Sequence, residues 1–208
     1  MTQARFITLE GGEGAGKSTQ ARRLAARLME RGHRVTLTRE PGGAPGAEAI
    51  RDLLVSGDTG RWTPLAETLL HFAAREDHLS RTIRPALGRG EWVISDRFVD
   101  STFAYQGAAQ GSARDTIEVL GKMVIGGDMP ELTLILDLPV DVGLARSHAR
   151  GGEDRYERMG PAFHETLRQA FLAIAKAQPE RCVTIDATAD EDEVARQIWH
   201  SVTSRLPV

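Results

Sequence analysis

Residues Leu9–Thr19 read LEGGEGAGKST, and within them Gly11–Ser18 match the pattern G-x-x-x-x-G-K-[ST]. The stretch follows a short apolar run, Phe6–Glu10, and opens a segment with helical spacing, Lys17–Arg31. Glycines at these positions let the backbone curl so that successive N–H groups face one anion. The helix that follows places the positive end of its dipole at the same point. The stretch therefore predicts a phosphate-binding loop between a strand and a helix.

The side chains of this loop have distinct expected roles. Lys17 would reach the outer phosphates of a bound nucleotide, and Ser18 would offer its hydroxyl to Mg²⁺. The alternative is a glycine-rich turn with an exposed lysine. The residues expected around the phosphates are Gly11, Gly12, Glu13, Gly14, Ala15, Gly16, Lys17, Ser18 and Thr19.

Glu13 is an unusual residue for an anion-binding loop. A carboxylate beside a bound phosphate costs electrostatic energy unless its side chain points elsewhere. Two explanations remain open. Either the side chain turns to solvent, or it faces a second substrate and accepts a hydrogen bond from a hydroxyl.

The rest of the chain alternates short apolar runs with longer amphipathic segments. This alternation predicts an α/β fold with a five-stranded parallel sheet and helices on both faces. Ligands of such sheets bind beyond the carboxyl ends of the strands. The expected strands are Phe6–Glu10, Val35–Thr38, Trp92–Asp96, Leu132–Asp137 and Cys182–Asp186. The expected helices are Lys17–Arg31, Ala47–Val55, Pro64–Leu87, Thr116–Ile125, Val140–Arg150, Pro161–Gln178 and Glu191–Arg205.

Composition narrows the class of protein. The chain has 208 residues, 41% of them hydrophobic, and a formal net charge of −3. These values predict a single globular domain over residues 1–208 and argue against a DNA-coating protein or a polybasic membrane anchor. The single cysteine, Cys182, excludes a disulfide framework and a cysteine-rich metal site. The sequence shows no bilayer-spanning stretch and no signal peptide, so we expect a cytoplasmic protein with neither a membrane nor a nucleic-acid partner.

Residue counts exclude one class of nucleotide-binding protein and favour another. The chain contains no asparagine, so it cannot read guanine with the Asn-Lys-x-Asp segment of common GTPases. Its length is also short for a helicase or AAA-type motor. The three lysines are far outnumbered by 23 arginines, which reflects either genomic base composition or bidentate recognition of phosphates. A small P-loop domain with arginine-rich segments is typical of a kinase for a phosphorylated acceptor, which needs a cationic cleft and a water-excluding lid.

Five further segments, taken in order, point to one family. They are TREPGG (Thr38–Gly43), ETLLHFAAR (Glu67–Arg75), SDRFVDSTFAYQG (Ser95–Gly107), RSHARGGEDRYE (Arg146–Glu157) and VTIDAT (Val183–Thr188). Together with the P-loop they resemble the bacterial thymidylate kinases over Leu9–Thr188. The resemblance implies a P-loop nucleoside monophosphate kinase fold and transfer of the ATP γ-phosphoryl to dTMP with Mg²⁺. It also implies a homodimer, which we expect to form through the helices near Leu65–Leu79 and Thr116–Ile125.

The same resemblance assigns residues to the acceptor site. Arg97 would bind the phosphate of dTMP, and Asp96 would hold Mg²⁺ through water. A strand-end Asp-Arg pair can also be a plain surface salt bridge. Arg75 would hydrogen-bond the pyrimidine. The remaining contacts that we expect at this site are Glu40, Pro41 and Arg51.

Thr102 and Tyr105 are expected to meet the same ligand, because residues three apart share a helix face. The resemblance implies that Thr102 touches the base, while Tyr105 crowds the 2′ position of the sugar and selects deoxyribose. The adjacent Gln106 would read the base edge. For Thr102 and Gln106, a solvated helix face is the open alternative.

Two positions depart from the family pattern. The family commonly stacks an aromatic residue on thymine four residues before the base-binding arginine, but that position is His71 here and the aromatic is Phe72. Either of them stacks on the base, or Phe72 belongs to the core. In the second departure, Gly14 stands where some relatives carry a catalytic arginine.

Because Gly14 carries no charge, the P-loop offers no arginine to neutralise the transferring phosphoryl group. We expect a lid at about residues 146–158 to supply one. Arginines there would have to meet the charge of the transferring phosphoryl group. Arg150, beside Gly151 and Gly152, is the first choice, and its alternative is a solvated arginine at a helix end. His148 occupies a family arginine position. The lid arginines are Arg146, Arg150 and Arg155, of which Arg146 and Arg150 are expected to contact ATP.

Two other functions remain open from the sequence. One is a kinase for a different pyrimidine monophosphate, such as CMP or UMP, which the base pocket would distinguish. The other is a P-loop module that senses nucleotide without turnover. The Asp-Arg and lid segments count against a sensor, because it would need no acceptor arginines.

Overall fold

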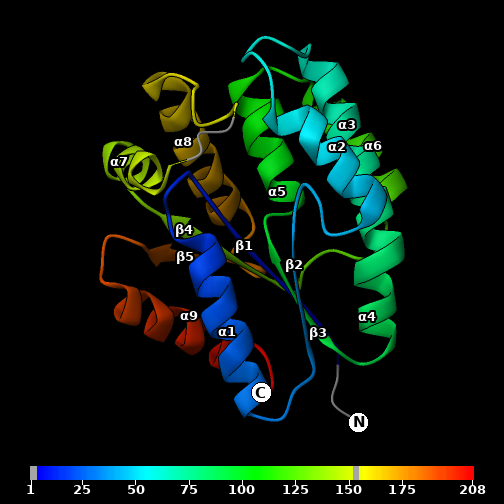
Figure 1. Ribbon diagram of the computed structural model, residues 1–208. Helices are drawn as coiled ribbons and strands as arrows, with labels where there is room; N and C mark the ends of the chain where they lie inside the picture. Colours follow the sequence, from blue (N-terminus) through cyan, green and yellow to red (C-terminus); the bar gives the residue numbers. More distant parts are fainter. Residues whose placement is uncertain (1–3, 152–154) are drawn as a thin grey trace.

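The computed structural model describes residues 4–151 and 155–208 (Figure 1). Five parallel strands form one sheet in the order β2-β3-β1-β4-β5. The predicted five-stranded parallel sheet is therefore confirmed. The strands are β1 (Arg5–Gly11), β2 (Val35–Arg39), β3 (Trp92–Asp96), β4 (Leu132–Asp137) and β5 (Cys182–Asp186).

Helices cover both faces of this sheet, because side chains along each strand alternate between two cores. Ile7 and Leu9 of β1 lie in a core with apolar residues of α1 (Lys17–Glu30) and α9 (Glu191–Arg205). Phe6, the residue before Ile7, faces a second core on the opposite side. Helices α3 (Pro64–His78), α6 (Arg114–Val124) and α8 (Pro161–Ala177) supply apolar residues on that side. The other helical segments are α2 (Pro45–Val55), η1 (Leu79–Ile83), α4 (Arg84–Gly88), α5 (Val99–Thr102), η2 (Phe103–Ala109) and α7 (Val140–Arg150).

The predicted single helix over Pro64–Leu87 is interrupted by the π-helical segment η1. Pro85 has no N–H to donate, and its ring crowds the carbonyl of the preceding turn. The chain widens locally instead, and the N–H of Arg84 bonds to the carbonyl of Leu79, five residues earlier. A second π-helical segment, η2, follows α5 and carries Tyr105 and Gln106.

The carboxyl ends of β1, β2 and β3 lie side by side at one rim of the sheet. Arg39 at the end of β2 is in register with Asp96 at the end of β3, and Leu9 of β1 is also paired with Asp96. This rim is where a parallel sheet places its ligands. Within the two described ranges, no helix has the length and apolar character needed to cross a membrane.

Candidate active site

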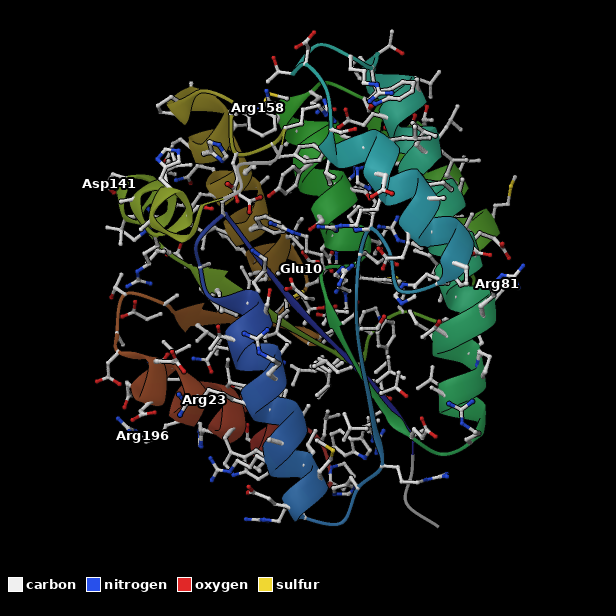
Figure 2. The ribbon with its side chains drawn as sticks, in the orientation of Figure 1. Glu10, Arg23, Arg81, Asp141, Arg158 and Arg196 are labelled. Atoms are coloured by element: carbon white, nitrogen blue, oxygen red, sulfur yellow. The ribbon has the colours of Figure 1, made fainter. Side chains whose placement is uncertain are left out.

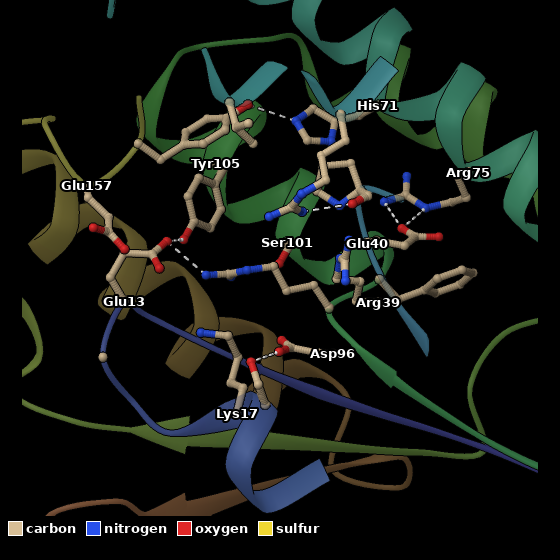
Figure 3. Close-up of a pocket in the computed structure, with 18 of the residues that line it drawn as sticks. Glu13, Lys17, Arg39, Glu40, His71, Arg75, Asp96, Ser101, Tyr105 and Glu157 are labelled. Carbon is tan, nitrogen blue, oxygen red and sulfur yellow. Dashed lines mark hydrogen bonds and ion pairs between the residues drawn. The ribbon is translucent and has the colours of Figure 1, made fainter. Parts of the chain in front are cut away.

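A cavity of about 630 Å³ opens at this rim (Figure 3). Its walls come from the P-loop, from the ends of β2 and β3, and from α2, α3 and η2. One cavity thus joins the predicted donor and acceptor residues. Those that line it are Glu13, Gly14, Gly16, Lys17, Ser18, Thr19, Glu40, Pro41, Arg51, Arg75, Asp96, Arg97, Tyr105 and Gln106.

The P-loop is bound closely to α7. Gly14 has φ of 68°, and a Cβ atom there would lie 2.0 Å from the carbonyl oxygen of Gly143. Only glycine adopts this conformation without strain and fits this contact. Position 14 therefore has no room for an arginine while α7 keeps this place, which is the structural reason for the departure noted in the sequence.

Lys17 is folded back onto its own loop. Its Nζ donates to the carbonyl oxygens of Gly11, at 3.1 Å, and Gly12, at 2.7 Å. Burial, together with the nearby charge of Arg97, lowers the pKa of Lys17 to about 8. Its position at the cavity wall suits a cation that moves to a phosphate when one enters.

Ser18 and Asp96 form the pair of oxygen ligands that the sequence predicts for a metal. The Ser18 hydroxyl, at the start of α1, donates to the Asp96 carboxylate at the end of β3. Hydroxyl and carboxylate oxygens are the hard ligands that suit Mg²⁺. Among the described residues there is no group of three or more His, Cys, Asp or Glu side chains that could hold a metal ion. This donor set fits an ion that is held largely by a nucleotide's phosphates.

Glu13 points into the cavity rather than toward solvent (Figure 3). It accepts hydrogen bonds from Arg97 Nη2 at 2.8 Å and from the Tyr105 hydroxyl at 2.6 Å. Burial alone would raise the pKa of Glu13. The charges of Arg97 and Lys17 and the Tyr105 hydrogen bond outweigh burial and lower that pKa to about 2. The charges of Arg97 and Lys17 therefore offset the electrostatic cost of an acid in the loop.

Arg97 sits on a strained turn that several bonds hold in place. It is the only residue other than glycine with positive φ, 72°, within the described ranges. Ser95 Oγ donates to the Arg97 carbonyl at 2.7 Å, and the next residue's N–H, that of Phe98, donates to Glu10 at 2.8 Å. Ser101 donates to the same carboxylate at 2.6 Å and accepts from Arg97 Nη1 at 3.2 Å. Such strain persists where the surroundings determine the conformation, as they do here.

Glu10 is a functional candidate that the sequence does not single out. It is fully buried at the end of β1, in the interior of the molecule (Figure 2). Burial and the neighbouring charge of Asp100 raise its pKa to about 8. Asp100 is itself paired with Arg181, at 2.7 Å. A buried acid at the end of a strand resembles an ordinary turn former in sequence, so its bonds to the Arg97 turn become visible only in three dimensions.

Arg75 is held deep in the acceptor side of the cavity. Its Nε donates to Glu40 at 2.9 Å, and its Nη2 donates to Thr102 Oγ1 at 3.1 Å. His78 pairs with the other oxygen of Glu40 at 3.1 Å. The third nitrogen of the guanidinium, Nη1, is buried and has no hydrogen-bond partner among the described residues. A buried donor of this kind is costly unless a ligand accepts from it.

The structure separates the two aromatic candidates. Phe72 is 2% exposed and packs in the core, with its ring centroid 5.0 Å from the guanidinium carbon of Arg75. It does not line the cavity, so the expected stacking of Phe72 on a base does not agree with its placement. Residues three and four before Arg75 lie on either side of its helix face, so packing decides which of them meets the cavity. His71 does line the cavity. Burial and the charges of Arg75 and Arg155 lower the pKa of His71 to about 3, so its ring is neutral.

Two of the expected lid arginines, Arg146 and Arg155, are bound to backbone carbonyls. Arg146 donates to the carbonyl of Ala187 at 3.3 Å and does not line the cavity. Arg155 is fully buried, and its Nε and Nη1 donate to the carbonyls of Leu54, at 2.8 Å, and Thr59, at 2.9 Å. Arg155 is therefore a structural residue here and not a free lid cation, which corrects that candidate. The side chain of Arg150, and residues 152–154, lie outside the described residues.

A cluster around Glu67 was also missed from the sequence. Glu67 lies one and two helical turns before His71 and Arg75, at spacings of four residues that place all three on one face of α3. That spacing is a signal that could have found it. The remaining acceptor residue, Arg51 on α2, donates to the Pro41 carbonyl at 2.8 Å and lines the cavity.

These features define a class of protein. A P-loop at the rim of a parallel sheet shares one cavity with a second group of arginines, so the cavity can hold two anionic ligands end to end. This is the arrangement of P-loop kinases that act on nucleoside monophosphates.

Comparisons with known proteins identify the family. The family model described as thymidylate kinase matches residues 9–198. The chain is 58% identical to a thymidylate kinase of Caulobacter vibrioides, over 99% of each chain. It is 52% identical to one of Dinoroseobacter shibae, over 98% of this chain and 99% of that relative. The crystal structure of thymidylate kinase from Ehrlichia chaffeensis superposes with a TM-score of 0.77 at 34% identity, covering 96% of this chain and 98% of that one. The chain belongs to the thymidylate kinase family and is a kinase, as the sequence predicted.

Proposed function

We propose that this chain transfers the γ-phosphoryl group of ATP to dTMP and releases ADP and dTDP. The observation that carries the proposal is the single cavity that joins the P-loop to Arg75 and Arg97. No covalent intermediate on the enzyme is required, because positioning and charge neutralisation supply most of the catalysis in phosphoryl transfer. The family membership, and the names of the relatives, support the same acceptor.

The donor side holds ATP through the residues of the P-loop. The N–H groups of residues 11–19 surround the phosphates, and Lys17 leaves the carbonyls of Gly11 and Gly12 to bind them. Ser18 and Asp96 would hold Mg²⁺, directly or through water. An ion held there would supply positive charge beside the phosphates.

The acceptor side holds dTMP through side chains that follow the ends of β2 and β3 and through side chains of α2, α3, α5 and η2. Arg97, with Arg51 on α2, binds the acceptor phosphate, and the loop of Glu40 and Pro41 closes that end. Arg75, Thr102 and Gln106 read the base. His71 lies against the base, while Phe72 supports Arg75 from the core. Tyr105 lies between Glu13 and the sugar.

The remaining elements of the proposal concern the lid and the assembly. Residues 146–158 form a lid within one kinase domain, and Arg150 neutralises charge on the transferring group. The enzyme works in the cytoplasm as a homodimer. Exposed apolar side chains on α3 and α6, which pack against each other, support the dimer. These side chains are Leu65, Leu69, Val119 and Met123.

Product analysis tests the proposed reaction. Purified protein with ATP, Mg²⁺ and dTMP should yield ADP and dTDP in equal amounts, each resolved by ion-exchange chromatography. Lys17→Ala should abolish both products, because the lysine binds phosphates and does not pack in the core. A Lys17→Ala protein that unfolds normally but keeps near-parental turnover contradicts the donor-site assignment.

A further inference from the structure

Glu67 is buried at a junction of three elements that meet beside the cavity. Its side chain is 1% exposed on α3. Oε1 accepts from Gln106 Nε2 at 2.8 Å, from Gln110 Nε2 at 2.8 Å and from the Tyr156 hydroxyl at 2.9 Å. Oε2 accepts from the buried guanidinium of Arg155. This carboxylate is not one of the groups that contact ATP or dTMP in the proposed reaction.

The bonds to Glu67 determine which way the Gln106 amide faces. Arg155 donates to Oε2 of Glu67 and three further donors share Oε1, so every hydrogen bond described for this carboxylate is one that it accepts. The amide of Gln106 has one donating end and one accepting end, and the carboxylate takes the donating end. Gln106 also lines the cavity, and no described residue donates to its Oε1. Glu67 takes one of the two N–H groups of this amide, which turns the amide nitrogen toward Glu67 and leaves the oxygen as the acceptor for a ligand in the cavity.

This oxygen and the guanidinium of Arg75 together offer one hydrogen-bond acceptor and one donor to a ligand. The Nη1 of Arg75 is a donor without a partner among the described residues, and Arg75 lines the same cavity. One donor and one acceptor match a pyrimidine with a carbonyl at C4 and N–H at N3, as in thymine. Cytosine presents the reverse pair, an amino group at C4 and an accepting N3, so it would leave buried groups unpaired.

We propose that Glu67 is a positioning residue for base selection: it fixes the Gln106 amide with its oxygen toward the acceptor base and so disfavours cytosine. This inference rests on the proposed dTMP kinase activity. Glu67 does not touch the substrate in this account. It acts through Gln106, and its ion pair with Arg155 holds the carboxylate in place.

The test compares kcat/KM for dTMP and dCMP, with ATP as donor, in the parent and in Glu67→Gln. The new amide can donate toward Gln106, which frees Gln106 to rotate and offer its own N–H₂ to the base. The ratio of kcat/KM for dTMP over dCMP should fall by roughly ten- to hundred-fold. The KM for ATP should stay at the parental value, because Glu67 does not line the cavity and bonds to no residue of the P-loop.

Gln110→Leu is the matched control. Gln110 bonds to the same carboxylate oxygen at the same distance as Gln106 but does not line the cavity, so its loss should leave the ratio unchanged. If Glu67→Gln does not fold, Glu67→Asp keeps the negative charge opposite Arg155 and withdraws the carboxylate from Gln106 by one methylene. The ratio should fall in that variant also.

The outcomes separate the two claims. A parent enzyme that does not prefer dTMP overturns the proposed function and this inference with it. A parent that prefers dTMP, with a ratio kept within twofold in folded Glu67→Gln or Glu67→Asp, overturns the inference and leaves the function standing. An equal fall in Gln110→Leu also overturns it, because loss of any bond to Glu67 would then suffice.

Discussion

At the scale of single residues, the site is a set of opposite charges that hold one another in place before substrate arrives. Glu13 bonds to Arg97 and Tyr105, and Lys17 bonds to the carbonyls of its own loop. Each of these groups is partly withdrawn from water, so each bond is stronger than a surface pair would be. Lys17 and Arg97, the cations proposed to bind the two phosphate groups, thus already lie at the cavity.

The depressed pKa of Glu13 predicts a pH-dependent stability. The pKa is about 2 in the folded protein against an ordinary value of 4.5, so the folded state binds fewer protons than the unfolded state between these values. The stabilisation is present above about pH 4.5, amounts to about 3 kcal/mol at most, and is lost as the pH falls toward 2. Thermal unfolding of the parent and Glu13→Gln should show a Tm difference that closes over this range. A difference that stays constant with pH contradicts the account.

Tyr105 gives a prediction about the sugar. Its ring is buried against Tyr156 and Phe171, while its hydroxyl bonds to Glu13. If the ring crowds the 2′ position, Tyr105→Ala should reduce the preference for the deoxy over the ribo form of thymidine monophosphate by about tenfold. Tyr105→Phe keeps the ring and should keep the preference. Steady-state kinetics with both acceptors measure this, and equal discrimination in the parent and Tyr105→Ala rules the role out.

The roles of single residues were the hardest feature of the site to predict from the sequence. The spacing of Gly11–Ser18 predicted the loop because consecutive residues form it. Glu10, Glu67 and Arg155 act through partners 80 or more residues away, or across the cavity, and their identity alone is that of ordinary charged residues. Phe72 and His71 differ by one position on α3, and only packing decides which of them faces the cavity.

At the scale of elements, the strands followed from their apolar runs, and β3, β4 and β5 begin and end where predicted. The two π-helical segments were not predicted from the sequence, because the spacing of apolar residues does not show where a helical turn contains one extra residue. The consequence for the site is direct, because η2 carries Tyr105 and Gln106. Their angular separation from Thr102 therefore departs from that of an ordinary helix.

The segment after α7 carries the prediction for the lid. Gly14 has no room for a side chain, and the guanidinium of Arg155 is bound in the interior, so Arg150 remains the first candidate for the transferring charge. Arg150→Ala should lower kcat on the order of 10³-fold while dTMP and ATP binding change little. Arg150→Lys should recover only part of this, because lysine lacks the planar fork.

Kinetics and calorimetric binding on both variants measure the effect of Arg150, with Arg146→Ala as the comparison on the same helix. If Arg150→Ala keeps its kcat and Arg146→Ala loses it, the assignment of the arginine is wrong. If both keep it, the lid does not supply the charge.

At the scale of the whole molecule, the exposed apolar residues of α3 and α6 predict the assembly. Leu69 is 47% exposed and Met123 is 76% exposed, on helices that pack against each other. Burial of this pair in a homodimer removes apolar surface from water. Leu69→Arg with Met123→Arg should raise the dimer dissociation constant at least tenfold. Sedimentation velocity measures this, and a parent protein that is monomeric at micromolar concentration contradicts the dimer.

The fold as a whole was the most predictable level, because alternating strand and helix patterns admit few topologies once crossovers are right-handed. The central claim lies at this level also, since two substrates must meet in one cavity. Turnover with ATP and Mg²⁺ against dTMP, dCMP, UMP, CMP, dAMP and dGMP tests it most directly. The account predicts the highest kcat/KM for dTMP, by at least tenfold over any other acceptor. Preference for a different acceptor, or ATP binding without turnover of any of them, would contradict it.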